Sequence, residues 1–190
     1  MQATKHATRL IGALLCLFSY ASMGGEATHL DFGNYVGRIY SDGSGNIGKQ
    51  SDVENFKDTW SFRIKTDEMT DEKVITVNRY AYKNSKEFGA LKLDHEIWLW
   101  INFSKEGRET LCIAGHDFPG KNGMIRIDKN DPITTSENGC VPLSRNLDAQ
   151  LKKGEQITLR GYHWPYEGGE TKKISLGGYV VVSEFLRTKR

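Results

Sequence analysis

Apolar residues recur mainly at every second position along this chain, in short runs separated by clusters of glycine, asparagine, aspartate and lysine. A period of two places alternate side chains on one face of a β-strand, so the pattern indicates half-buried strands. Trp60, Phe62 and Ile64 follow it closely. The run "EIWLWINF", residues 96–103, is apolar at successive positions instead. It therefore predicts a central strand that is covered on both faces.

Further strands are predicted where similar runs are bounded by turn-forming residues. In "MIRID" the side chains of Ile125 and Ile127 should point inward. The run "KVITVNRYAY" carries two interleaved apolar sets, which predicts a strand bent by a bulge. The remaining predicted strands are "NYVGRIY", "TLCIA", "QITLRGYHW" and "GGYVVVSEF".

One helix is clearly indicated after Ser144, whose side chain can cap its first turn. Leu143, Leu147 and Leu151 repeat every fourth residue, which places them on one face of a helix. Gly154 follows the last repeat and can adopt the left-handed conformation that often ends a helix. The sequence therefore predicts a short amphipathic helix that ends at this glycine.

A second, weaker helix start lies at Ser51, where Glu54 completes a capping-box pattern. The sum is seven to nine short strands with one or two short helices. We therefore expect a mainly β protein, a single antiparallel β-sandwich or barrel-like domain. Residues 28–58 should supply an N-terminal strand and a polar loop, and residues 59–190 the β-sandwich domain.

Residues 1–27 have the layout of a secretory signal peptide, with Lys5 and Arg9 ahead of an uncharged apolar run. The run covers about a dozen residues, where a membrane-spanning helix needs about twenty. We expect cleavage near residues 24–27, a periplasmic or secreted protein, and no transmembrane segment afterwards. Removing Lys5, Arg9 and Glu26 changes 26 basic and 24 acidic residues to 24 and 23, a net charge of +1. So neutral a chain does not favour nucleic acid as the partner.

The segment "GSGNIG", residues 43–48, matches the G-x-G-x-x-G pattern of phosphate-binding turns. That fingerprint needs an apolar helix opening at the last glycine, whereas "KQSDVENFKD" is polar. A flexible loop is the favoured interpretation. A calcium loop of the EF-hand type is excluded, because Ile47 stands where that loop needs glycine and Val53 where it needs glutamate.

Four histidines follow the predicted signal, and none has the spacing of a zinc motif: His29, His95, His116 and His163. We therefore predict no metal site and no cofactor. His116 and Asp117 resemble a catalytic base with its orienting acid, but the chain has no G-x-S-x-G nucleophile motif. A non-enzymatic protein is the favoured reading. The alternative is an envelope hydrolase that uses Asp117 or Asp128 with His116.

Cys112 and Cys140 are the two cysteines that follow the predicted signal. In an oxidising compartment they are expected to form one disulfide, which closes a loop of about 28 residues and contributes roughly 3–4 kcal/mol. Two free buried thiols are the alternative, because spacing alone does not bring sulfur atoms together.

The second half of the chain contains an ordered set of short motifs: "FPGKNGMIRIDKNDPI", "NGC", "LDAQLKKGEQITLRGY" and "ISLGGYVVVSEFL". Their order resembles the invasion-associated locus B family of small exported bacterial proteins. The resemblance implies a β-sandwich in the periplasm or at the cell surface, linked in some members to host-cell invasion, with no established catalytic residues. The chain departs from the family in having no cysteine between Cys112 and Gly139, which implies a different disulfide pairing.

The segment "GYHWPYEGG" carries Tyr162, Trp164 and Tyr166, which we expect on one face around Pro165. Tyrosine and tryptophan are common interface anchors, so these three are the predicted binding residues. The alternative is that they merely pack over a sheet edge. The favoured function is an exported, non-enzymatic protein that binds a protein or envelope partner. A periplasmic accessory factor or inhibitor of a secretion or envelope system is the alternative with the same fold.

Overall fold

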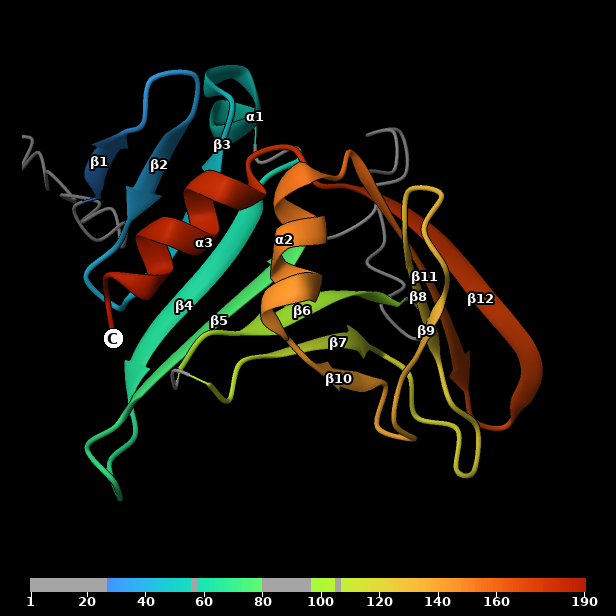
Figure 1. Ribbon diagram of the computed structural model, residues 1–190. Helices are drawn as coiled ribbons and strands as arrows, with labels where there is room; N and C mark the ends of the chain where they lie inside the picture. The colour runs from blue at the N-terminus through green and yellow to red at the C-terminus, as the bar shows by residue number, and fades with distance from the viewer. Residues whose placement is uncertain (1–26, 56–57, 80–96, 105–106) are drawn as a thin grey trace, which may run out of the picture.

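The computed structural model describes residues 27–55, 58–79, 97–104 and 107–190. They form two antiparallel sheets with three short helices, which confirms the predicted mainly β sandwich (Figure 1). The larger sheet has eight strands, in spatial order β1 (Thr28–Asp31), β2 (Val36–Ile39), β3 (Ser44–Gly48), β4 (Trp60–Thr66), β5 (Lys73–Arg79), β6 (Trp98–Asn102), β7 (Thr110–Ala114) and β10 (Cys140–Pro142). The smaller sheet has the order β12 (Tyr166–Ser175), β11 (Gln156–His163), β8 (Met124–Ile127) and β9 (Ile133–Thr134).

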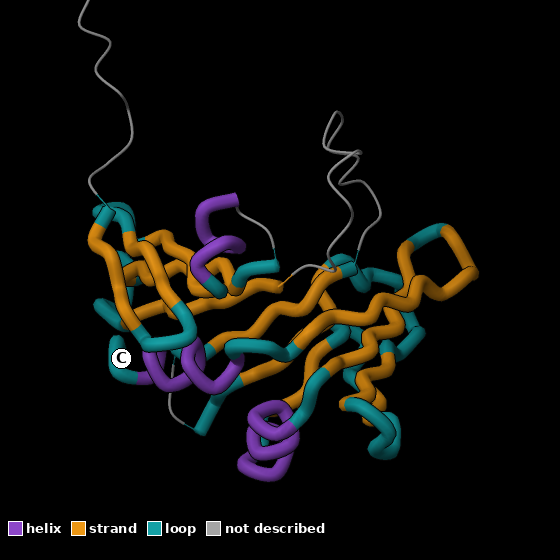
Figure 2. Tube along the Cα trace, turned by 90° about the horizontal axis from the view of Figure 1, so that it is seen from above, coloured by secondary structure: helices purple, strands orange, loops and turns teal. Residues whose placement is uncertain are grey.

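The register of the larger sheet gathers its apolar positions on one face. Phe62, Val77, Ile101, Leu111 and Val141 stand opposite one another from β4 across to β10, and all are buried. Directly paired residues point to the same face, so this row forms a continuous apolar surface. Helices α2 (Arg145–Lys153) and α3 (Tyr179–Arg187) lie on that side, whereas α1 (Gln50–Asn55) lies on the other (Figure 2).

Helix α2 begins where the sequence predicts. The Ser144 hydroxyl accepts the backbone N–H of Leu147 at 3.2 Å, and Leu147 and Leu151 are buried. The expected left-handed stop at Gly154 is wrong, because this residue is extended, with φ −76° and ψ 155°. A glycine is needed there for space instead. A Cβ atom would lie 2.7 Å from Cγ2 of Ile127, on the neighbouring sheet.

The predicted strand "GGYVVVSEF" is wrong, because its residues from Tyr179 onward form helix α3. Gly178 precedes the helix with φ 83°, a conformation that turns the chain and favours glycine. Tyr179, Val182 and Leu186 then share one buried face, and the Tyr179 ring packs 5.7 Å from Trp60. Burial of this helical stripe outweighs the β-propensity of the valine run.

The segment "GSGNIG" is not the expected loop. Residues 44–48 form strand β3, which pairs with both β2 and β4. Position 45 needs glycine for space, because a Cβ atom there would lie 2.3 Å from the ring of Phe62 and 2.3 Å from the carbonyl oxygen of Arg38. The stretch 28–58 therefore contributes three strands and α1 to the structure, and β3 joins it directly to the rest of the larger sheet.

The predicted disulfide is present between Cys112 on β7 and Cys140 on β10. The two residues are direct partners in the antiparallel register, with Cα atoms 4.0 Å apart. The alternative of two free thiols is therefore wrong. The disulfide attaches the short edge strand β10 to the sheet. Parts of the sequence predictions lie outside the described residues: positions 1–26 of the predicted signal peptide 1–27, positions 80–82 of "KVITVNRYAY", His95, and Glu96 of the predicted strand 96–103.

Candidate binding site

Strands β11 and β12 form a hairpin that projects from the smaller sheet (Figure 1). Its tip carries two of the predicted binding residues, Trp164 and Tyr166, whose side chains are 58% and 56% exposed. The peptide bond between Trp164 and Pro165 is cis. Single exposed apolar residues are ordinary on protein surfaces, but two large aromatic rings exposed on one tip are a feature found at interaction sites. The tip is therefore the first place to look for a binding surface.

The three predicted aromatic residues do not share one face, contrary to expectation. Tyr166 stacks on His163, with ring centroids 6.2 Å apart and planes 19° from parallel. Tyr162 precedes His163 in the strand and points to the opposite face, where its ring lies 6.0 Å from that of His116. Trp164 packs edge-on against Phe118 at 5.2 Å. Lys121 Nζ lies over the rings of both Phe118 and Tyr162, at 4.1 and 5.2 Å, so Tyr162 and Trp164 pack around the same neighbours. Trp164 and Tyr166 are the exposed rings at the tip, and they lie against different neighbours.

His116 is buried and both of its ring nitrogens are engaged. Nδ1 accepts the backbone N–H of Tyr162 at 2.9 Å, and Nε2 lies 3.0 Å from the carbonyl oxygen of Lys121. An N–H group can only donate, so Nδ1 carries no proton and Nε2–H must donate to the carbonyl. Two backbone groups thus fix the tautomer and the orientation of the imidazole, which is a structural role.

Asp117 continues this attachment along the end of β11. Its backbone N–H donates to the carbonyl oxygen of Tyr162 at 3.0 Å, as a neighbouring strand would. Its carboxylate Oδ1 accepts the backbone N–H of Trp164 at 2.9 Å and a ring N–H of His163 at 2.9 Å. Residues 116 and 117 therefore each bond to β11, and this holds the hairpin tip in place.

Asp128, the other carboxylate of the hydrolase alternative, lies at the far end of β11. Its Oδ1 and Oδ2 accept the backbone N–H groups of Glu155 and Gln156. Gln156 begins β11 and His163 ends it, so the two ends are roughly 20 Å apart at about 3.3 Å per residue. The structure thus separates Asp128 from His116 and Asp117. Asp128 and His116 therefore do not belong to one catalytic centre.

A cavity of about 280 Å³ lies beside the tip, on the face that carries Tyr166. Its lining is mostly apolar surface and backbone, with a single carboxylate from Glu170, and consists of Ile97, Gly161, His163, Tyr166, Gly168 and Glu170. The carboxylate accepts the backbone N–H of Ile97 at 3.2 Å and pairs with Lys172 at 2.7 Å. The sequence does not reveal this cavity, because glycines carry no hydrophobic signal.

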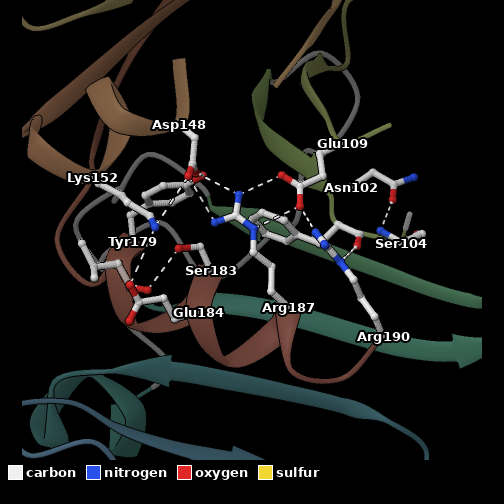
Figure 3. Close-up of polar contacts among 12 residues, drawn as sticks. Asn102, Ser104, Glu109, Asp148, Lys152, Tyr179, Ser183, Glu184, Arg187 and Arg190 are labelled. Atoms are coloured by element: carbon white, nitrogen blue, oxygen red, sulfur yellow. Dashed lines mark hydrogen bonds and ion pairs between the residues drawn. The ribbon is translucent and has the colours of Figure 1, made fainter. Parts of the chain in front are cut away.

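A second polar cluster joins α2 and α3 to the larger sheet (Figure 3). The Arg187 guanidinium donates to Asp148 at 3.0 Å and to Glu109 at 2.8 Å, and Arg190 also pairs with Glu109. The Tyr179 hydroxyl donates to Asp148 at 2.7 Å. These groups come from both helices, from the residues after α3 and from the residue before β7. The cluster therefore links the two helices to the larger sheet.

Electrostatics supports this structural role. Burial raises the pKa of Tyr179 well above its ordinary value, and the adjacent Asp148 carboxylate adds to the effect. Burial of Asp148 works against its ionisation, but hydrogen bonds from Arg187 and Tyr179 outweigh it and leave its pKa below the usual value. Tyr179 is thus held neutral and Asp148 charged, which is the pattern of a satisfied ion-pair network.

Arg79 forms a third cluster beneath the start of α3. Its guanidinium is buried, bonds Asp58 at 2.8 Å and the carbonyl oxygen of Gly177 at 2.9 Å, and lies 4.8 Å from the ring centroid of Trp60. Burial lowers the pKa of Arg79, and the charge of Asp58 opposes that shift. The Trp60 indole N–H donates to the same carbonyl at 2.8 Å. This cluster anchors the turn into α3.

Within the described ranges, no three or more His, Cys, Asp or Glu side chains gather as metal ligands. His29 lies on β1, and His95 falls outside those ranges. No helix in the described part of the chain is long and apolar enough to cross a membrane.

Comparison with models of protein families, with curated proteins and with solved structures gives no match. The geometry of the hairpin tip therefore carries the functional argument.

Proposed function

We propose that this protein is an exported, non-enzymatic binding module whose hairpin tip docks a protein partner in the bacterial envelope or on a host cell. The observation that carries the proposal is the exposure of Trp164 and Tyr166, each more than half accessible, on one tip. Both rings rest on an aromatic neighbour, Phe118 and His163 respectively. A partner would thus meet rings that are already positioned.

Rigidity of the tip favours binding, because a surface ordered in advance loses less entropy on association. The Trp164 backbone is held by Asp117, and the Tyr162 backbone by His116 and Asp117. The cavity beside Tyr166 offers a recess for one apolar side chain of a partner. Exposed aromatic anchors next to a small recess are typical of the centre of a protein interface.

Two further observations support export. A disulfide between partner strands is stable in an oxidising compartment and rare in the cytoplasm. The resemblance of the second half to the invasion-associated locus B family also points to the periplasm or cell surface. An accessory factor or inhibitor of an envelope system would share this fold and differ only in its partner, so the identity of the partner separates the two proposals.

The test is site-specific photo-crosslinking in intact cells, with a photoreactive residue placed at Tyr166. The control site is Met69, a 92% exposed apolar residue in the turn between β4 and β5 of the other sheet. We expect a discrete adduct from position 166 and none from position 69. A Trp164→Ala substitution in the same chain should remove most of that adduct.

Folding of the variant has to be measured alongside. Trp164 keeps most of its surface in water and loses one edge-on ring contact, so Trp164→Ala should cost no more than about 1 kcal/mol of stability. Loss of several kcal/mol would assign Trp164 to the scaffold rather than to a binding surface. Equal adducts from positions 166 and 69, or a 166 adduct unaffected by Trp164→Ala, would refute the proposal.

A further inference from the structure

Strand β12 is the longest strand that the structure describes, at ten residues, and it forms one edge of the smaller sheet. In the described part of the chain it pairs with β11 on one side, and its other side is the outer margin of the sheet (Figure 1). Most of its side chains are exposed. A long edge strand is a template for pairing with another strand, and proteins commonly protect such edges.

The charges of β12 are divided between its halves. Glu167 and Glu170 lie in the first half, and Lys172 and Lys173 in the second. Lysine on an edge ordinarily discourages pairing, because a partner strand would have to desolvate it. The exception is a partner that brings carboxylates to the same places. An antiparallel copy of β12 does this, since its acidic half meets the basic half of the first strand.

We propose that β12 pairs antiparallel with β12 of a second copy of this chain, around a two-fold axis near the middle of the strand. Such a contact uses the same surface on both copies and closes as a dimer. Each copy would place Glu167 and Glu170 within the range of direct and diagonal cross-strand neighbours of the partner's Lys172 and the partner's Lys173. Glu170 and Lys172 already pair within each strand at 2.7 Å and would share that pair across the contact, whereas Glu167 and Lys173 are the exposed charges that the contact newly brings together. The two smaller sheets then join into one eight-stranded sheet.

The geometry of this dimer adds to the proposed function without depending on it. Tyr166 begins β12, and an antiparallel pair places the first residues of its two strands at opposite ends. Ten residues at about 3.3 Å each separate the two hairpin tips by roughly 30 Å along the strands. A surface that carries repeated partners could then be held by both tips at once, with a gain in avidity.

Single charge reversals test the proposal. Glu167→Lys and Lys173→Glu change exposed side chains of β12, one in each half. In either homodimer the substitution replaces attraction by repulsion twice, because of the two-fold symmetry. We expect each variant to raise the dimer dissociation constant at least about tenfold in sedimentation equilibrium. An equimolar mixture of the two variants should recover the wild-type affinity, because the heterodimer restores opposite charges.

Matched controls come from the larger sheet. Glu68→Lys and Lys65→Glu make the same charge changes at exposed positions in and next to β4, and should leave dimerisation unchanged. Circular dichroism of every variant checks folding. In the wild type, hydrogen exchange of the β12 amides should slow as protein concentration rises.

Three results would each overturn the proposal. The first is a wild-type chain that stays monomeric up to about 1 mM, a concentration at which even a weak specific dimer forms. The second is a dimer that β12 variants weaken no more than the controls, because another surface would then form it. The third is a mixture of the two β12 variants that associates no better than either one alone. Crosslinks from Tyr166 to another protein test the proposed function separately, and their outcome does not depend on dimerisation.

Discussion

Breaking the disulfide between Cys112 and Cys140 should make the protein markedly less stable. The bond closes a loop with a sequence separation of 28 residues. In the chain-entropy model a loop of that length reduces the entropy of the unfolded chain by about 12 cal/mol/K, which is about 3.6 kcal/mol at room temperature. A domain of this size has about 5–15 kcal/mol of net stability, so the bond supplies a large part of it.

Thermal unfolding should report the same loss as a fall in the melting temperature of roughly 7–14 °C, at about 2–4 °C per kcal/mol.

The position of the bond explains why other contacts of β10 do not make up for the lost stability. Strand β10 has three residues and pairs with β7 at the edge of the sheet, so few other contacts hold it there. Opening of β10 would expose Val141, a member of the buried apolar row.

The assay is urea unfolding of the oxidised protein against the same protein kept in dithiothreitol. Reduction removes the crosslink and leaves both sulfur atoms in the chain, so it separates the loop effect from changes in packing. A Cys112→Ala, Cys140→Ala double variant, measured without reductant, should match the reduced protein to within about 1 kcal/mol. Equal unfolding midpoints for the oxidised and reduced proteins would refute the reasoning.

Two further substitutions test the polar clusters. Tyr179 has a raised pKa when folded, so its contribution to stability is complete below the ordinary tyrosine pKa of about 10 and is lost as the pH rises above it. Wild-type stability should therefore fall more steeply above about pH 10 than that of Tyr179→Phe, in urea titrations across this range; parallel curves would contradict a buried neutral tyrosine. His116→Ala leaves the Tyr162 N–H and the Lys121 carbonyl without their partner and should cost about 2–4 kcal/mol in chemical unfolding. The control His163→Ala removes a partly exposed pair with Asp117 and should cost less than about 1 kcal/mol; equal losses would show that His116 is not the specific support of the hairpin.

The sequence correctly predicts the helices and strands in which the buried positions repeat with the same period as the apolar residues. The alternation of Trp60 and Phe62 recurs in β4, where both are buried, and Ile125 and Ile127 point inward from β8 as expected. The Ser144 cap with the leucine repeat placed α2 correctly. Each signal is local, because a cap or an alternation is complete within about ten residues.

Prediction failed where contacts distant in sequence decide the conformation. The valines after Gly178 favour a strand, yet packing on Trp60 makes them part of a helix. The helix pattern predicts a left-handed stop at Gly154, yet this residue is extended and leaves room for the side chain of Ile127. Strand β12 carries few apolar residues, so its pairing with β11 has no hydrophobic signal in the sequence.

The candidate site divides in the same way. The sequence by itself predicts Tyr162, Trp164 and Tyr166 as binding residues, because size and amphipathic character are properties of single side chains. The structure shows which two of them are exposed, Trp164 and Tyr166. The sequence also predicts the bond between Cys112 and Cys140, the two cysteines that follow the predicted signal, and the structure contains that bond. The tertiary structure alone decided that His116 and Asp117 hold β11 and that Tyr162 packs beside His116, away from Tyr166. It alone placed a cavity beside Tyr166 and left β12 at an edge. Those features depend on contacts between backbone groups that are far apart in sequence, and the pattern within a short segment does not specify such contacts.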